Sequence, residues 1–163
     1  MKRLSVLLIS ILVASMAYCQ DIKLFSTYVK PTGESRYAFV LSDNSIWWGD
    51  PTEDQWNQVS TSELPANFSI KHFSTYVKPT GASRYVIVLS DNSIWWADPN
   101  DTQWVQVSAE GLPAKFNVKE LSTYIKPNGE SRFCIVLSDN TIWWAEPNNA
   151  QWVHVLTTGV KTK

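Results

Sequence analysis

The sequence predicts an all-β protein made of three copies of one four-stranded antiparallel unit. The first observation is an internal repeat of 48 residues, with no insertion or deletion between copies. The second is that each copy holds four short segments rich in β-branched and aromatic residues, separated by turn residues. The third is that no stretch shows the 3.6-residue hydrophobic period of an amphipathic helix.

The first 19 residues have the pattern of a secretory signal peptide. The basic start Met1-Lys2-Arg3 precedes an apolar run from Leu4 to Tyr18, which is too short to span a bilayer. Cleavage after Cys19 would leave 144 residues, which is three times 48. The sequence therefore predicts a signal peptide at 1–19, no membrane span, and a secreted, periplasmic or extracellular protein.

The remaining chain, 20–163, is predicted to be a single repeat domain. Its units are 20–67, 68–115 and 116–163, and Ser26-Thr27-Tyr28 recurs at the same place in each unit. All nine tryptophans fall into equivalent sets. The sets are Trp47, Trp48 and Trp56 in the first unit, Trp95, Trp96 and Trp104 in the second, and Trp143, Trp144 and Trp152 in the third.

Turn residues divide each unit into strands. In the second unit the predicted strands are 73–78, 84–89, 94–96 and 103–107. Pro79 ends the first strand, and Asp91-Asn92 supplies the side chains of a hairpin turn between the second and third. Asp98-Pro99 begins the turn to the fourth strand, and Gly111-Leu112-Pro113 leads to the next unit.

Two architectures use four-stranded units of this size, the β-propeller and the β-trefoil. The run from Tyr85 to Leu89 is apolar at five successive positions, as expected of a strand covered on both faces. This favours propeller blades, which pack face against face. Three blades are too few to close a ring, so we predict a homodimer with six blades; a monomeric β-trefoil is the alternative.

The unit also resembles a known family. Val40 to Trp48, followed by Trp56 and then Leu64-Pro65, is similar to the blade repeat of secreted β-propeller lectins. That resemblance implies a propeller that binds sugars. In the fucose-binding members an Arg, a Glu and an aromatic residue form the pocket. Here the third predicted strand carries Trp-Trp and offers no repeated Glu.

Catalytic and metal-binding patterns are absent from the sequence. His72 and His154 occupy non-equivalent places in their units, and no set of three or four zinc ligands has suitable spacing. No Gly-x-Ser-x-Gly motif occurs. The acidic cluster of Asp50, Glu53 and Asp54 fades in the third unit, so we interpret it as a solvated turn. The sequence therefore predicts a protein that is not an enzyme and needs no metal or cofactor.

The charge of the chain argues against nucleic acid as a partner. The formal net charge is −1, and it becomes −3 without Lys2 and Arg3, with 12 basic against 15 acidic residues. No basic block remains outside the predicted signal peptide. A protein of this kind lacks the positive surface that neutralises phosphates.

The repeated aromatic and polar residues instead suit a glycan or polysaccharide. An indole can stack on the apolar face of a sugar while charged and amide groups bind its hydroxyls, and repetition in one body raises the overall affinity. The candidate ligand-binding residues are Arg36, Arg84, Arg132, Trp48, Trp96, Trp144, Trp56, Trp104 and Trp152.

A structural role for the same residues remains open. A repeated tryptophan is more often a core residue than a ligand platform. The arginines could equally stack on a neighbouring Trp or Tyr. Because successive strand residues face opposite sides, Trp47 and Trp48 cannot point into the same layer. The alternative function is therefore a non-catalytic protein-interaction or envelope-structural module.

Overall fold

The computed structural model describes residues 20–100, 103–147 and 149–156, which form twelve strands. The predicted signal peptide lies outside these residues. The first sheet, sheet 1, contains β1 (Ile22–Val29), β2 (Ser35–Leu41), β3 (Ile46–Gly49) and β4 (Trp56–Val59). Sheet 2 contains β5 (Ile70–Val77), β6 (Ser83–Leu89), β7 (Ile94–Ala97) and β8 (Trp104–Val107). Sheet 3 contains β9 (Val118–Ile125), β10 (Ser131–Leu137), β11 (Ile142–Glu146) and β12 (Asn149–Val155).

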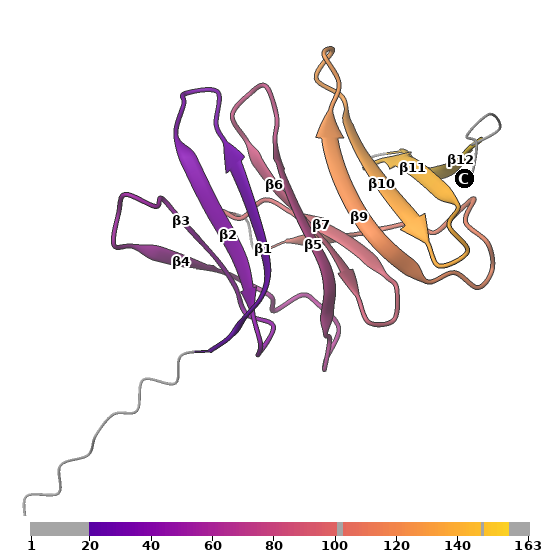
Figure 1. The fold of residues 1–163 in the computed structure, drawn as a ribbon, viewed down its shortest axis with the longest axis horizontal. Helices are drawn as coiled ribbons and strands as arrows, with labels where there is room; N and C mark the ends of the chain where they lie inside the picture. The colour runs from indigo at the N-terminus through magenta and orange to yellow at the C-terminus, as the bar shows by residue number, and fades with distance from the viewer. Residues whose placement is uncertain (1–19, 101–102, 148, 157–163) are drawn as a thin grey trace, which may run out of the picture.

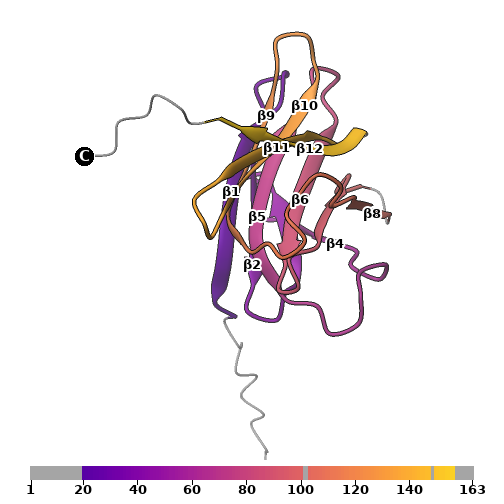
Figure 2. The same cartoon turned by 90° about the vertical axis from the view of Figure 1, so that its right-hand side faces the viewer.

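Each sheet is an antiparallel meander in which the strands pair in chain order. The three sheets stand side by side, with β1 against β5 and β5 against β9 (Figure 1). The turned view of Figure 2 shows the inner strands β1 and β5 lying nearly one behind the other. The predicted all-β repeat of four-stranded units is confirmed. The β-trefoil alternative is wrong, because no described sheet combines strands of two repeats into a barrel.

The hairpin turns between the second and third strands follow the Asp-Asn signal. Asn44, Asn92 and Asn140 adopt left-handed backbone conformations with φ of 68°, 68° and 65°, which asparagine tolerates better than most residues. The carboxylate of Asp43 accepts a hydrogen bond from the Ser45 amide at 2.8 Å, as in an Asx turn. Local side-chain chemistry therefore sets the strand ends.

Each sheet has two faces. The forward face is on the side toward the next sheet in chain order, and the backward face is the opposite one. Ser26 on the forward face of sheet 1 bonds Thr75 on the backward face of sheet 2, with 2.7 Å between hydroxyl oxygens. Ser74 and Thr123 repeat this bond between sheets 2 and 3 at 2.8 Å. Adjacent residues of a strand therefore belong to different interfaces.

Two hydrophobic clusters fill the spaces between the sheets. Ile87 and Tyr85 belong to the cluster between sheets 1 and 2, whereas Val86 and Val88 belong to the cluster between sheets 2 and 3. The run from Tyr85 to Leu89 is accordingly buried at every position, as predicted for a strand covered on both faces. In the described part of the chain, no helix is long and apolar enough to cross a bilayer.

His72 lies in the second interface and has a lowered pKa. Its Nε2–H donates to the carbonyl oxygen of Val118 at 3.1 Å. Burial, which disfavours the charged ring, is the main reason for the lowered pKa, and the Val118 carbonyl and Glu120 act in the opposite direction. The unfolded chain therefore takes up this proton at a higher pH than the folded chain does.

The resulting pH dependence can be tested with the residue that the first repeat carries. As pH falls through about 6.5 towards the lower folded pKa, protonation of His72 favours the unfolded chain. We expect the free energy of unfolding of the wild type to fall, relative to that of His72→Leu, when urea titrations move from pH 8 to pH 5. His154→Gln, which removes the exposed histidine, is the control. Parallel curves for wild type and His72→Leu would contradict the expectation.

Candidate functional site

One end of each sheet carries an arginine stacked over a tryptophan. The arginine begins the second strand and the tryptophan belongs to the third strand, on the same forward face. The guanidinium carbon lies 6.0 Å from the ring centroid for Arg36 and Trp48, 5.4 Å for Arg84 and Trp96, and 4.7 Å for Arg132 and Trp144. These separations are within the range of cation–π contacts.

A carboxylate holds each of these arginines in place. The β2–β3 register sets Tyr37 opposite Gly49, which brings Arg36 next to Asp50. Arg36 Nη1 donates to Asp50 Oδ2. In sheet 3, Arg132 Nη2 lies 2.6 Å from Glu146 Oε1. A charge-assisted bond of this kind fixes the plane of the guanidinium. Glu34 and Glu130 also accept from Arg36 and Arg132.

The acidic residue of this pair was misjudged from the sequence. We interpreted Asp50 as part of a solvated turn because its neighbours Glu53 and Asp54 are not repeated. The position itself is acidic in all three repeats, as Asp50, Asp98 and Glu146, and each pairs with the arginine of its own sheet. The 48-residue spacing of these three carboxylates was the signal that could have identified them.

Hydrogen bonds lower the pKa of two carboxyl groups near the arginines. The hydroxyl and amide of Thr52 donate to Asp50 Oδ1, and together with the charge of Arg36 they lower its pKa. Lys126 and then Asn128 lower the pKa of Glu130, with a smaller effect from Arg132. Both groups are therefore ionised at neutral pH and able to accept hydrogen bonds.

A cavity of about 150 Å³ lies between sheets 2 and 3 beside Arg84 and Trp96. Sheet 2 contributes Tyr76, Lys78, Arg84 and Trp96, and sheet 3 contributes Gly129, Glu130, Ser131, Glu146 and Pro147. Burial raises the pKa of Tyr76, so its phenol keeps its proton at neutral pH. This Arg–Trp cleft thus combines an indole, a phenol, cations and carboxylates, contributed by two neighbouring repeats.

Two buried donors of the cleft lack an acceptor among the described residues. They are Arg84 Nε and Trp96 Nε1, and Arg36 Nε is in the same state one sheet earlier. A buried donor without a partner costs about 1–3 kcal/mol. An oxygen that enters the cleft, with a small shift of these side chains, would satisfy them.

The structure divides the predicted site residues into two groups. The three arginines lie with Trp48, Trp96 and Trp144 at the ends of the sheets. Trp47 and Trp48 point to opposite faces of their strand, as expected. Trp48 packs against the cluster between sheets 1 and 2 from the forward face of sheet 1. Trp95, the equivalent of Trp47, packs against that same cluster from the backward face of sheet 2.

Trp104 and Trp152 are core residues, which corrects the prediction that they bind ligand. Only 5% and 3% of their surfaces are exposed, and their indole N–H groups donate to the carbonyl oxygens of Ser60 and Ser108. They lie on backward faces, so the preceding sheet covers them. Trp56 is 43% exposed and contacts Phe39 edge to face. None of the three lines the Arg–Trp cleft.

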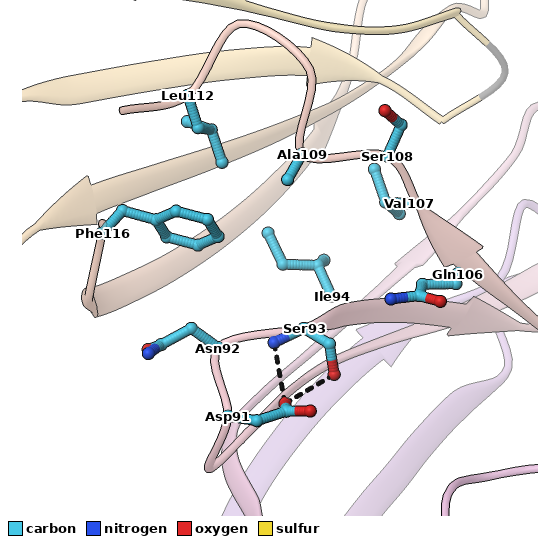
Figure 3. Close-up of a pocket in the computed structure, with 10 residues that line it drawn as sticks. All are labelled: Asp91, Asn92, Ser93, Ile94, Gln106, Val107, Ser108, Ala109, Leu112 and Phe116. Atoms are coloured by element: carbon cyan, nitrogen blue, oxygen red, sulfur yellow. Dashed lines mark hydrogen bonds between the residues drawn. The ribbon is translucent and has the colours of Figure 1, made fainter. Parts of the chain in front are cut away.

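A larger cavity of about 460 Å³ lies at the opposite end of sheet 2 (Figure 3). It sits between the β6–β7 hairpin and the segment after β8, where Leu112 and Phe116 face Ile94. The Asp91 carboxylate at its edge is bonded by the amide and hydroxyl of Ser93. The cavity contains none of the predicted arginines or tryptophans, and its lining has no cation. The predicted site residues therefore lie at the smaller Arg–Trp cleft, which is the candidate site.

In the described part of the chain, no three His, Cys, Asp or Glu side chains gather closely enough to hold a metal ion. Cys134 is an unpaired thiol, and burial raises its pKa. A raised pKa lowers the fraction of reactive thiolate.

Comparisons with known proteins show the fold. No protein-family model and no curated protein sequence matches the chain. The structure is similar to that of a fucose lectin from Kordia zhangzhouensis in complex with methyl-fucoside. The TM-score is 0.53 at 12% sequence identity, and the similarity covers 86% of this chain and 100% of that chain. At this identity the similarity shows the fold, an all-β arrangement of repeated four-stranded sheets.

Proposed function

We propose that this protein is a secreted, multivalent and non-enzymatic carbohydrate-binding protein. The observation that carries the proposal is the Arg–Trp cleft, where an indole, a phenol and charged groups surround a space of about 150 Å³. The volume suits a single sugar ring better than a drug-sized ligand, because pockets for the latter usually exceed about 300 Å³. The similarity to a fucose lectin supports the proposal at the level of the fold.

The chemistry of the cleft matches a sugar. The arginine and the indole N–H can donate to ring and hydroxyl oxygens, while the carboxylates of Glu130 and Glu146 can accept from sugar hydroxyls. The equivalent residues between sheets 1 and 2 are Arg36 and Trp48 of sheet 1 with Asp98 of sheet 2, and Ala82 takes the place of Glu130. Several weak sites in one body then give a higher overall affinity through effective concentration.

The proposal is tested by titrating methyl-fucoside and a panel of other methyl glycosides, followed by a glycan array. We expect the double variant Trp48→Leu and Trp96→Leu to weaken binding of the preferred sugar by about tenfold or more, since tenfold corresponds to only about 1.4 kcal/mol. The matched control is Trp95→Leu, because Trp95 neighbours Trp96 on the same strand but points to the other interface.

The control should retain both its fold and its sugar affinity. Far-ultraviolet circular dichroism and thermal unfolding check that each variant is folded. If no glycan binds to the wild type at millimolar concentration, or if Trp95→Leu loses as much affinity as the double variant, the carbohydrate proposal is wrong. The protein-interaction or structural module would then take its place.

A further inference from the structure

Two sheet faces of the molecule are uncovered among the described residues. They are the backward face of sheet 1 and the forward face of sheet 3. Tyr37, on the first of these faces, is 38% exposed, whereas its equivalent Tyr85 is fully buried. On the second face Tyr124 is 46% exposed, whereas its equivalent Tyr76 is 6% exposed. The same residues are therefore buried wherever the chain supplies another sheet to cover them.

The hydrogen bonds that join the sheets recur with the 48-residue period. Asn44 Oδ1 accepts from the amide of Ile70, the first residue of the next sheet, at 3.0 Å. The second interface repeats this bond at 3.1 Å between the equivalent residues. Asn140 and Ile22 are the members of the same pair that face outward, one at each end of the stack.

The hydroxyl–hydroxyl bond and a lysine contact between the sheets also recur with the 48-residue period. Ser122 on sheet 3 and Thr27 on sheet 1 are equivalent to the bonded pairs Ser26–Thr75 and Ser74–Thr123. Lys23 Nζ donates to Ser69 of the next sheet at 3.1 Å, and Lys71 donates to Asn117. At the open end, Lys119 is the donor of this set, and the residue equivalent to its acceptor is Asp21, an opposite charge.

The buried tryptophans complete the pattern. Trp104 Nε1 donates to the Ser60 carbonyl at 2.7 Å, and Trp152 makes the equivalent bond at 2.8 Å. Trp56 is the third member of this set, and the carbonyl that corresponds to it belongs to Leu156. Trp56 is 43% exposed and Leu156 is 74% exposed. Both are large apolar residues that are exposed to water, one on sheet 1 and one after the last strand of sheet 3.

We propose that a second copy of this chain covers both faces. The backward face of its sheet 1 docks on the forward face of sheet 3, and the reciprocal contact closes a ring of two chains. The two uncovered faces are complementary, because equivalent forward and backward faces already pack against each other between sheets 1 and 2 and between sheets 2 and 3. Propellers usually close with four to eight sheets, and six is the only multiple of three in that range, so two copies suffice.

Ring closure also completes an Arg–Trp cleft at sheet 3, an inference that rests on the proposed function. Sheet 3 carries Arg132 stacked on Trp144, and no following sheet faces this pair among the described residues. In the ring, those turns come from the partner subunit's Glu34 and the partner subunit's Asp50, which are equivalent to Glu130 and Glu146 of the cleft between sheets 2 and 3. Each subunit would then bind three sugars, one of them only in the dimer.

The assembly is tested by size-exclusion chromatography with light scattering over a range of concentrations. We expect a constant mass of twice the chain mass for the wild type. Thr27→Arg places a long cation on the uncovered face at an exposed position, so the chain should fold and run at half that mass. The matched control is Ala66→Arg, which adds the same charge in the exposed segment between sheets 1 and 2 and should remain dimeric.

A second measurement uses Cys134, whose equivalents Ala38 and Val86 are fully buried. Maleimide labelling of the peptide that contains Cys134 should be faster in Thr27→Arg than in the wild type. Sugar titration should give three sites per chain in the wild type and two in Thr27→Arg. A monomeric wild type, a mass that grows with concentration, or a dimeric Thr27→Arg would overturn the ring. Intact dimers that bind no sugar would overturn the proposed function alone.

Discussion

Replacing Tyr85 with alanine is expected to lower the free energy of unfolding by about 3–5 kcal/mol, the range for buried aromatic side chains. Tyr85 is fully buried in the middle sheet. Its ring packs edge to face against Phe73 and Tyr28, with centroids 5.5 and 6.2 Å away. The variant would leave a cavity between sheets 1 and 2 that rigid sheets cannot collapse to fill. Equilibrium denaturation with urea measures the loss.

Two further variants separate the parts of this effect. Tyr85→Phe keeps the ring and removes only the hydroxyl, which lies 3.2 Å from the Tyr28 hydroxyl, so a loss of about 1 kcal/mol is expected. Tyr37→Ala removes the equivalent side chain of sheet 1. Both alanine variants are compared in the Thr27→Arg background, so that association does not contribute. Equal losses for Tyr37→Ala and Tyr85→Ala would contradict the burial argument.

Replacing Gly111 with alanine is expected to lower the free energy of unfolding by about 3 kcal/mol. Gly111 has a φ of +92°, and a left-handed conformation costs a residue with a Cβ about 1–2 kcal/mol. A Cβ at this position would also overlap the carbonyl oxygen of Trp152 and lie 3.2 Å from its nitrogen. Relieving such overpacking costs a further 1–3 kcal/mol or so. Thermal or urea unfolding measures the sum.

The matched control for this variant is Gly81→Ala. Gly81 has a similar φ of +85°, but nothing lies within 4 Å of the Cβ that alanine would add. Gly81→Ala should therefore lower the free energy of unfolding only by the cost of the left-handed backbone conformation, about 1–2 kcal/mol. If both variants lose the same stability, the close approach of the segment after β8 to Trp152 has no energetic weight.

Gly111 shows how far a repeat can mislead about one position. The equivalent residue in the first repeat is Glu63, whose carboxylate accepts from the Trp104 amide at 3.3 Å. In the second repeat the Trp152 amide is bonded instead by the backbone carbonyl of Glu110 at 2.9 Å. The chain passes closer to the next sheet there, and only glycine permits it. The sequence predicted a connecting segment at this place, but it did not show that the two copies accept the tryptophan amide through different groups.

The candidate site was predictable in part. Residue type and period were enough to single out the repeated arginines and the Trp48 set, which the structure places in contact; that they bind a ligand stays a prediction. The carboxylate at Asp50, Asp98 and Glu146 was missed because its role depends on the β2–β3 register, which brings the end of the third strand beside the start of the second. Lys78 and Glu130 come together only because sheets 2 and 3 pack face to face.

Residues that are close together along the chain are enough to predict the four strands of each repeat, their turns and the opposite orientation of Trp47 and Trp48. Which copy of each repeated residue is exposed depends instead on how the sheets pack against one another. Trp56, Trp104 and Trp152 are the same residue at the same place in the repeat, yet they are 43%, 5% and 3% exposed. Burial of this tryptophan depends on whether a preceding sheet covers the backward face, and among the described residues no sheet precedes sheet 1.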